Sequence, residues 1–167
     1  MNIQALNLFI VDDNKMLVKA LHHYLEEKFG NELNISTFNS GASVLKEVDL
    51  NTGIVVLDYQ LKGESGNDVL TAIKNINPKT EVIMLSTHKE IGVAIESYRK
   101  GATDFVVKGE NDWKKLSMII RKILMYPIRI LTEELKVSKF VAIFLTTFIT
   151  MGIIVFAVIQ LMGWNQR

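Results

Sequence analysis

Hydrophobic residues occur in two patterns along the chain. Short, continuous β-rich runs are typical of strands, and a spacing of three and four residues is typical of helices. The short apolar runs predict strands at residues 6–11, 33–38, 54–57, 81–85 and 103–107. The segments with helical spacing predict helices at residues 14–29, 42–48, 67–76, 90–100 and about 111–125. Gly30, Pro78 and Gly101 mark expected helix ends.

This alternation of strands and helices predicts an α/β fold. We expect a five-stranded, doubly wound parallel sheet of the flavodoxin-like kind, because right-handed crossovers place successive helices over both faces of the sheet. The run 54–57 (IVVL) is apolar throughout, which is typical of a strand covered on both faces, whereas 33–38 is typical of an edge strand. Chemistry in such a fold is expected at the carboxyl ends of the strands.

The run 140–162 contains no charged residue and is apolar almost throughout. As a helix it would be roughly 34 Å long, enough to cross a hydrocarbon core of about 30 Å. A buried core helix is the alternative, but such helices seldom run so long without a charge or a polar face. The sequence therefore predicts a single transmembrane α-helix after the sheet domain.

Positive charges flank this run unequally. The cations that precede it are Arg121, Lys122, Arg129, Lys136 and Lys139. Only Arg167 follows it. Because positive flanks stay in the cytoplasm, we expect a single-pass protein of the inner or plasma membrane whose sheet domain faces the cytoplasm.

The expected organisation has four parts. Residues 1–125 form the sheet domain, 126–139 a juxtamembrane connector, 140–162 the transmembrane helix and 163–167 a short extracytoplasmic tail. Pro127 is expected either to end one helix or to begin another.

Small side chains recur every four residues within the predicted span, at Ala142, Thr146 and Thr150. This spacing permits close approach of two helices, so a homodimer or a pairing with another spanning helix is one hypothesis. A lipid-facing run with incidental threonines is the alternative.

Composition narrows the function classes. The chain has 167 residues, a formal net charge of +1 and no cysteine. That length holds one ordinary domain plus the anchor. The balanced charge gives no case for nucleic-acid binding, so we expect no nucleic-acid partner. Without cysteine, disulfide and thiolate chemistry are excluded.

Polar residues stand at the ends of four predicted strands. Asp12 and Asp13 follow the first strand, Asp58 the third, Ser86 the fourth and Lys108 the fifth. Crowded carboxylates repel one another unless a cation neutralises them, and hard oxygen ligands suit Mg²⁺. Lys108 and Ser86 could receive a phosphoryl group, since phosphoryl transfer asks mainly for positioning and charge neutralisation. Asp58 would be the carboxylate nucleophile. An ordinary helix cap at Asp13 or Asn14 and a turn at Asp58 are the alternatives.

These residues carry a resemblance to a known family. In order, they are the acidic pair after an apolar strand, Asp58 closing IVVLD, Gly66 eight residues later, Ser86 in MLST and Lys108 in DFVVK. From about residue 3 to residue 125, the chain resembles a response-regulator receiver domain similar to the chemotaxis receiver. Such domains are the phosphoacceptor half of two-component signalling.

The resemblance implies roles for individual residues. Asp58 would be phosphorylated by a histidine kinase, a phosphotransfer protein or a small phosphodonor. Asp13, Asp58 and the backbone carbonyl of Gln60 would bind Mg²⁺, with Asp12 acting through water. Ser86 and Phe105 would shift together after phosphorylation, although Phe105 is equally well explained as a core residue. The protein would then be a phosphoacceptor that assists its own phosphorylation and dephosphorylation, and not an enzyme in the ordinary sense.

The chain departs from the family pattern near the site. Gly109 follows Lys108 where proline is usual, and Thr87 stands where alanine is common beside the hydroxyl. His88 occupies a position that modulates access to the phosphoryl group in receivers, although a simple loop histidine is at least as good an explanation.

Three functions remain open from the sequence. The favoured one is a membrane-anchored receiver in a phosphorelay that signals through protein–protein interaction. The second is a phosphate sink that drains a histidine kinase. The third is a membrane scaffold with an incidental acidic site.

Overall fold

The computed structural model describes residues 5–87, 91–109 and 111–164. Side chains are described over these ranges except at 126–143, 145, 159 and 161–164. The chain divides into two compact units, Met1–Ile123 and Leu124–Arg167.

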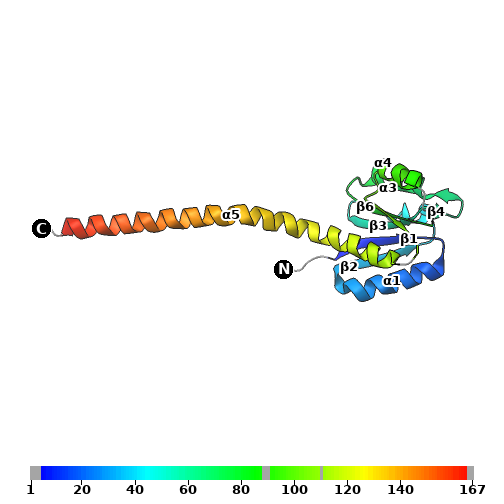
Figure 1. Ribbon diagram of the computed structural model, residues 1–167, viewed down its shortest axis with the longest axis horizontal. Helices are drawn as coiled ribbons and strands as arrows, with labels where there is room; N and C mark the ends of the chain where they lie inside the picture. The colour runs from blue at the N-terminus through cyan, green and yellow to red at the C-terminus, as the bar shows by residue number, and fades with distance from the viewer. Residues whose placement is uncertain (1–4, 88–90, 110, 165–167) are drawn as a thin grey trace. The chain divides into compact units, whose positions relative to one another are not determined.

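The first unit contains a five-stranded sheet in the order β2-β1-β3-β6-β7 (Figure 1). Its strands are β1 (Leu6–Val11), β2 (Leu33–Phe38), β3 (Thr52–Asp58), β6 (Glu81–Ser86) and β7 (Asp104–Val107). Each neighbouring pair is parallel. The predicted α/β fold with a five-stranded parallel sheet is therefore confirmed. The order also places the ends of β1 and β3 side by side.

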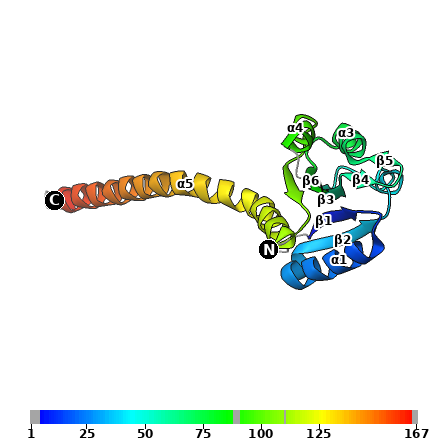
Figure 2. The same cartoon turned by 45° about the vertical axis from the view of Figure 1, so that its right-hand side comes forward.

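Helices cover both faces of this sheet (Figure 2). They are α1 (Lys15–Phe29), α2 (Gly41–Val44), α3 (Gly66–Ile76), α4 (Ile91–Arg99) and α5 (Asp112–Trp164), with a 3₁₀ turn η1 (Gly30–Glu32). The start of α5 packs beside α1, where the rings of Tyr24 and Trp113 lie 5.3 Å apart between centroids. The helices α3 and α4 lie together on the other side, as Figure 2 shows.

Alternate side chains of the strands fill two cores. Val11, Leu57 and Met84 belong to one buried cluster, into which α3 contributes Leu70 and Ile73. The alternate strand positions are also buried, with Leu8, Ile10, Ile54, Val56 and Ile83 fully shielded from solvent. Burial of both faces is the normal condition of a parallel sheet, and it explains why the central strands are apolar at nearly every position.

A short hairpin follows β3 that the sequence reasoning did not predict. Its strands are β4 (Gln60–Leu61) and β5 (Glu64–Ser65), which pair antiparallel. Gly63 turns the chain with φ of +79°, a conformation that glycine adopts without the steric cost of a side chain. A glycine between two short strand-like segments is a sequence signal for a hairpin, so the sequence contained a signal for this element.

Helix α5 runs without a break through Pro127 to Trp164. The expectation of a helix end or start at Pro127 is wrong. Proline removes one backbone donor and bends a helix, but it does not always end one.

The described part of the structure does not support the predicted transmembrane helix. Within the part of the chain that the structure describes, no helix is both long enough and apolar enough to span a bilayer. Positions 140–143, 145, 159, 161 and 162 of the predicted span lie outside the residues whose side chains are described. The anchor therefore stays a prediction.

Candidate functional site

Three carboxylates meet at the carboxyl edge of the sheet. Asp12 and Asp13 follow β1, and Asp58 ends β3. One carboxylate oxygen from each of the three lies within 4.8 Å of the others. Asp12 and Asp58 are buried, at 1% and 6% exposure, whereas Asp13 is exposed. The gathering of acids predicted from the strand ends is present because β1 and β3 are direct neighbours.

Lys108 joins the two buried acids. Its Nζ lies 2.7 Å from Oδ2 of Asp12 and 3.0 Å from Oδ1 of Asp58. The Lys108 side chain is itself only 15% exposed. The backbone fixes its position, because the Lys108 N–H donates to the carbonyl of Ser86 at 2.7 Å. Since unpaired buried charges are costly, the lysine compensates for the burial of two carboxylates.

The electrostatics of the pair follow from this geometry. Burial raises the pKa of the Asp58 carboxyl above its ordinary value, and the negative charge of Asp12 adds to the effect. The hydrogen bond and charge of Lys108 oppose that rise. Burial alone would lower the pKa of Lys108, but its hydrogen bonds to Asp12 and Asp58 outweigh burial and raise it. Lys108 therefore stays protonated at neutral pH.

Backbone groups hold the carboxylates in place. The N–H of Asn14 donates to Oδ1 of Asp12 at 2.8 Å, and the N–H of Gln60 donates to Oδ1 of Asp58 at 3.4 Å. The side chain of Asn14 caps α1 by accepting from the N–H groups of Met16 and Leu17. The alternative that Asp13 or Asn14 caps the first helix is therefore confirmed for Asn14 and not for Asp13.

Gly66 allows the chain to pass very close to the acid. A Cβ at this position would collide with the carbonyl oxygen of Asp58 and with the backbone of Tyr59. The N–H of Gly66 also donates to the carbonyl of Tyr59 at 2.8 Å. Any larger residue here would push the end of β3 away from α3, which explains a glycine at this spacing from Asp58.

The donor set suits a hard divalent cation. Carboxylate oxygens are the ligands that Mg²⁺ prefers, and an exposed member such as Asp13 leaves room for the waters that Mg²⁺ retains. The ammonium of Lys108 supplies a second positive centre on the same edge. The arrangement can neutralise a transferred phosphoryl group beside a carboxylate nucleophile.

A family model described as the response regulator receiver domain matches residues 8–121 of this chain. The chain belongs to the response regulator receiver family. It is a receiver domain of two-component signalling. Receiver domains bind Mg²⁺ at the acidic pocket that Asp12, Asp13 and Asp58 form here.

Curated relatives are longer than this receiver. The transcriptional regulator NtrC of Escherichia coli is 29% identical over 120 residues, covering 71% of this chain and 25% of its own length. MalR of Bacillus subtilis is 30% identical over 105 residues, covering 62% of this chain and 44% of its own length. This chain therefore spans a quarter to under half of the length of these relatives.

Solved receivers share the fold. The response regulator TrrA from Thermotoga maritima, in complex with Mg²⁺ and BeF, has a TM-score of 0.61 and 26% identity, covering 70% of this chain and 97% of its own. A CheY-like receiver domain from Methanospirillum hungatei has a TM-score of 0.63 at 19% identity, a likeness of fold alone.

Ser86 and Phe105, the remaining residues named from the sequence, lie in β6 and β7. Ser86 ends β6, is 1% exposed, and its carbonyl accepts from Lys108. Phe105 in β7 is a member of the main buried cluster, so its core role is confirmed. Its movement on phosphorylation stays a prediction. The described peptide bonds include no cis bond. His88 lies outside the described residues.

We expect Lys108→Gln to raise the pKa of Asp58 further, because the charge and hydrogen bond that favour the carboxylate are lost. The side-chain carboxyl ¹³C shift of Asp58, followed by NMR over pH, measures this. Lys79→Gln is the control, because Lys79 precedes β6 at the opposite edge of the sheet. An unchanged Asp58 titration in Lys108→Gln would contradict the assigned role of the lysine.

Proposed function

We propose that this receiver accepts a phosphoryl group on Asp58 and signals by binding a partner protein. The observation that carries the proposal is the contact of Lys108 Nζ with Asp58 Oδ1 at 3.0 Å inside a cluster of three carboxylates. Asp58 is the member of the cluster that closes the central strand β3. Asp12 has the shorter contacts, 2.7 Å to Lys108 and 2.8 Å to the Asn14 N–H, whereas Asp58 lies 3.0 Å from Lys108 and 3.4 Å from the Gln60 N–H, so Asp58 is the less tightly held acid.

The transfer step is a displacement at phosphorus. An Oδ atom of Asp58 forms a new O–P bond while the P–N bond of a phosphohistidine, or the P–O bond of a small donor, breaks. The leaving imidazole nitrogen or oxygen takes the electron pair and is protonated from solvent. Lys108 holds its ammonium beside the acceptor oxygens, where negative charge increases. The protein is a phosphoacceptor, and no separate substrate is turned over.

Asp12, Asp13, Asp58 and the backbone carbonyl of Gln60 would hold Mg²⁺. The ion would neutralise the phosphoryl oxygens and offset repulsion among the carboxylates. The hairpin of β4 and β5 positions Gln60, since its two strands pair Gln60 with Ser65.

The donor partner in this proposal is a histidine kinase or a phosphotransfer protein. Family membership supports a partner of this class. A CheY from Borrelia burgdorferi, 28% identical to this chain, was solved in complex with CheX, BeF3 and Mg²⁺, so a receiver of this likeness does bind another protein.

Acetyl phosphate with Mg²⁺ is expected to add one phosphoryl group to the intact chain, and peptide mass spectrometry should place it on Asp58. Asp58→Asn removes the nucleophile, so labelling should disappear. Asp68→Asn is the matched control, since the Asp68 side chain is 80% exposed and lies outside the acidic cluster. Labelling that persists in Asp58→Asn would overturn the assignment.

The lifetime of the phosphoryl group separates signalling from a phosphate sink. A signalling receiver should keep the group long enough to bind a partner, whereas a sink should lose it fast and drain the donor. Intact-mass measurement after removal of acetyl phosphate gives this lifetime. Signalling in cells that survives Asp58→Asn would instead favour a scaffold.

We propose further that the run 140–162 holds the receiver at an inner or plasma membrane, with the sheet domain on the cytoplasmic side. The uncharged sequence of this run supports the proposal. Large apolar side chains are exposed in its described part, among them Phe148, Met151 and Phe156. The hydroxyl of Thr150 donates to the Thr146 carbonyl at 2.9 Å, so this polar group is satisfied within the helix.

A double variant, Met151→Lys with Ile154→Lys, is expected to release the chain from membranes that retain the wild type through alkaline carbonate washing. Each lysine near the centre of a spanning helix costs about 2.5–3.5 kcal/mol on insertion scales. Met16→Lys with Ile91→Lys is the control, because both residues are exposed apolar positions of the receiver unit. Wild-type chain that washes off with carbonate would contradict the membrane proposal.

A further inference from the structure

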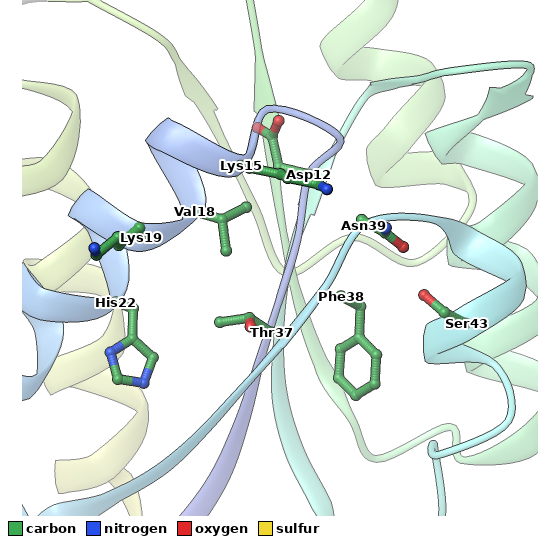
Figure 3. Close-up of a pocket in the computed structure, with 9 residues that line it drawn as sticks. All are labelled: Asp12, Lys15, Val18, Lys19, His22, Thr37, Phe38, Asn39 and Ser43. Atoms are coloured by element: carbon green, nitrogen blue, oxygen red, sulfur yellow. The ribbon is translucent and has the colours of Figure 1, made fainter.

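A groove lies beside α1, at the edge of the sheet formed by β2. It has a volume of about 540 Å³, within the range of small-molecule sites. Figure 3 shows Val18 and His22 from α1 on one side and Thr37 and Phe38 from β2 on the other, with Asp12 near one end. The remaining lining residues are Lys15, Lys19, Asn39 and Ser43. Through Asp12, the groove adjoins the acidic cluster.

The α1 side of the groove is basic. Lys15, Lys19 and His22 lie four and three residues apart, so the helix presents them along one face. Within the described part of the chain, neither lysine lies within 4.0 Å of a carboxylate, whereas His22 Nδ1 is 3.7 Å from Glu26. Asp12 is the one acid in the lining, and Lys108 already pairs with it at 2.7 Å. The positive charge of the groove is therefore not compensated locally.

The β2 side offers apolar contact and hydrogen bonds. The Phe38 ring is held edge-on by Phe9, with centroids 5.0 Å apart. Val18 lies opposite Thr37 in Figure 3. Asn39 is exposed at the mouth, and Ser43 is half-buried. A groove that combines apolar side chains, hydrogen-bonding groups and two lysines without a carboxylate within 4.0 Å among the described residues is complementary to an organic molecule that carries phosphate.

We propose that this groove binds an organic phosphate, meaning a flat or apolar body that bears at least one phosphate group, such as a nucleotide. In Figure 3 the Lys15 and Lys19 side chains end in opposite directions, so both would turn toward a phosphate bound on the α1 side of the groove, where neither has a carboxylate within 4.0 Å among the described residues. The apolar body would lie against Val18 and Phe38. The site is separate from phosphorylation of Asp58, and it needs no divalent ion, because its charges are ammonium groups.

ADP is a suitable probe, used with EDTA present so that the acidic cluster cannot bind it through a metal. Amide NMR of the full chain should show saturable shifts along residues 15–22 and 37–43. Adenosine tests the apolar body without charge, and pyrophosphate tests charge without the body. We expect ADP to bind most tightly, with both halves weaker.

Lys15→Gln with Lys19→Gln should weaken ADP binding by about tenfold or more, since each charged hydrogen bond contributes strongly to phosphate binding. Lys28→Gln is the control, because Lys28 also lies on α1 but outside the groove. ADP binding is measured without a phosphodonor and without Mg²⁺, so a failure of the phosphoacceptor role would not mimic a failure here.

Three results would overturn the proposal. They are no saturable shift with ADP at millimolar concentration, equal ADP affinity in the double lysine variant and the wild type, or shifts centred on Asp58 and Lys108. Pyrophosphate binding as tight as ADP binding would overturn it as well, because the groove would then be an inorganic anion site and the organic body would have no role.

Discussion

The contact of one buried ammonium with two buried carboxylates is the constraint on which this structure depends. Lys108 lies within 3.0 Å of both Asp12 and Asp58, which would otherwise be two like charges in a dry environment. Removing Lys108 would leave two buried carboxylates without a counter-charge, whereas removing either aspartate would leave the lysine paired with the other. The same contact prepares the site for chemistry, because a positive centre already stands beside the oxygen that would attack phosphorus.

The topology of the sheet brings these three side chains together. The acids converge because β1 and β3 are parallel neighbours, and the lysine reaches them because β7 continues into a backbone bond between Lys108 and Ser86. Gly66 lets α3 begin against the carbonyl of Asp58. Local backbone geometry, apolar burial on both faces and electrostatic pairing thus all specify the same arrangement.

Much of this could be predicted from the sequence because its signals are periodic and local. Strand runs, helix spacing and acids after strands gave the fold and the cluster of Asp12, Asp13 and Asp58. The groove beside α1 could not be predicted, because it depends on how α1 crosses β2, which no local pattern encodes. The helix break expected at Pro127 is absent, since proline bends a helix without always ending it. The hairpin at Gly63 was missed although its signal was present.

The most direct test of the central claim is calorimetric titration of the full chain with Mg²⁺. If the three carboxylates form one site, the wild type should bind one ion per chain, and Asp13→Asn should weaken binding while Asp68→Asn leaves it unchanged. Asp13 is the informative position, because it is exposed and its loss disturbs no buried pair. Absence of saturable Mg²⁺ binding, or equal affinity in Asp13→Asn and the wild type, would contradict the convergence of these acids on one cation.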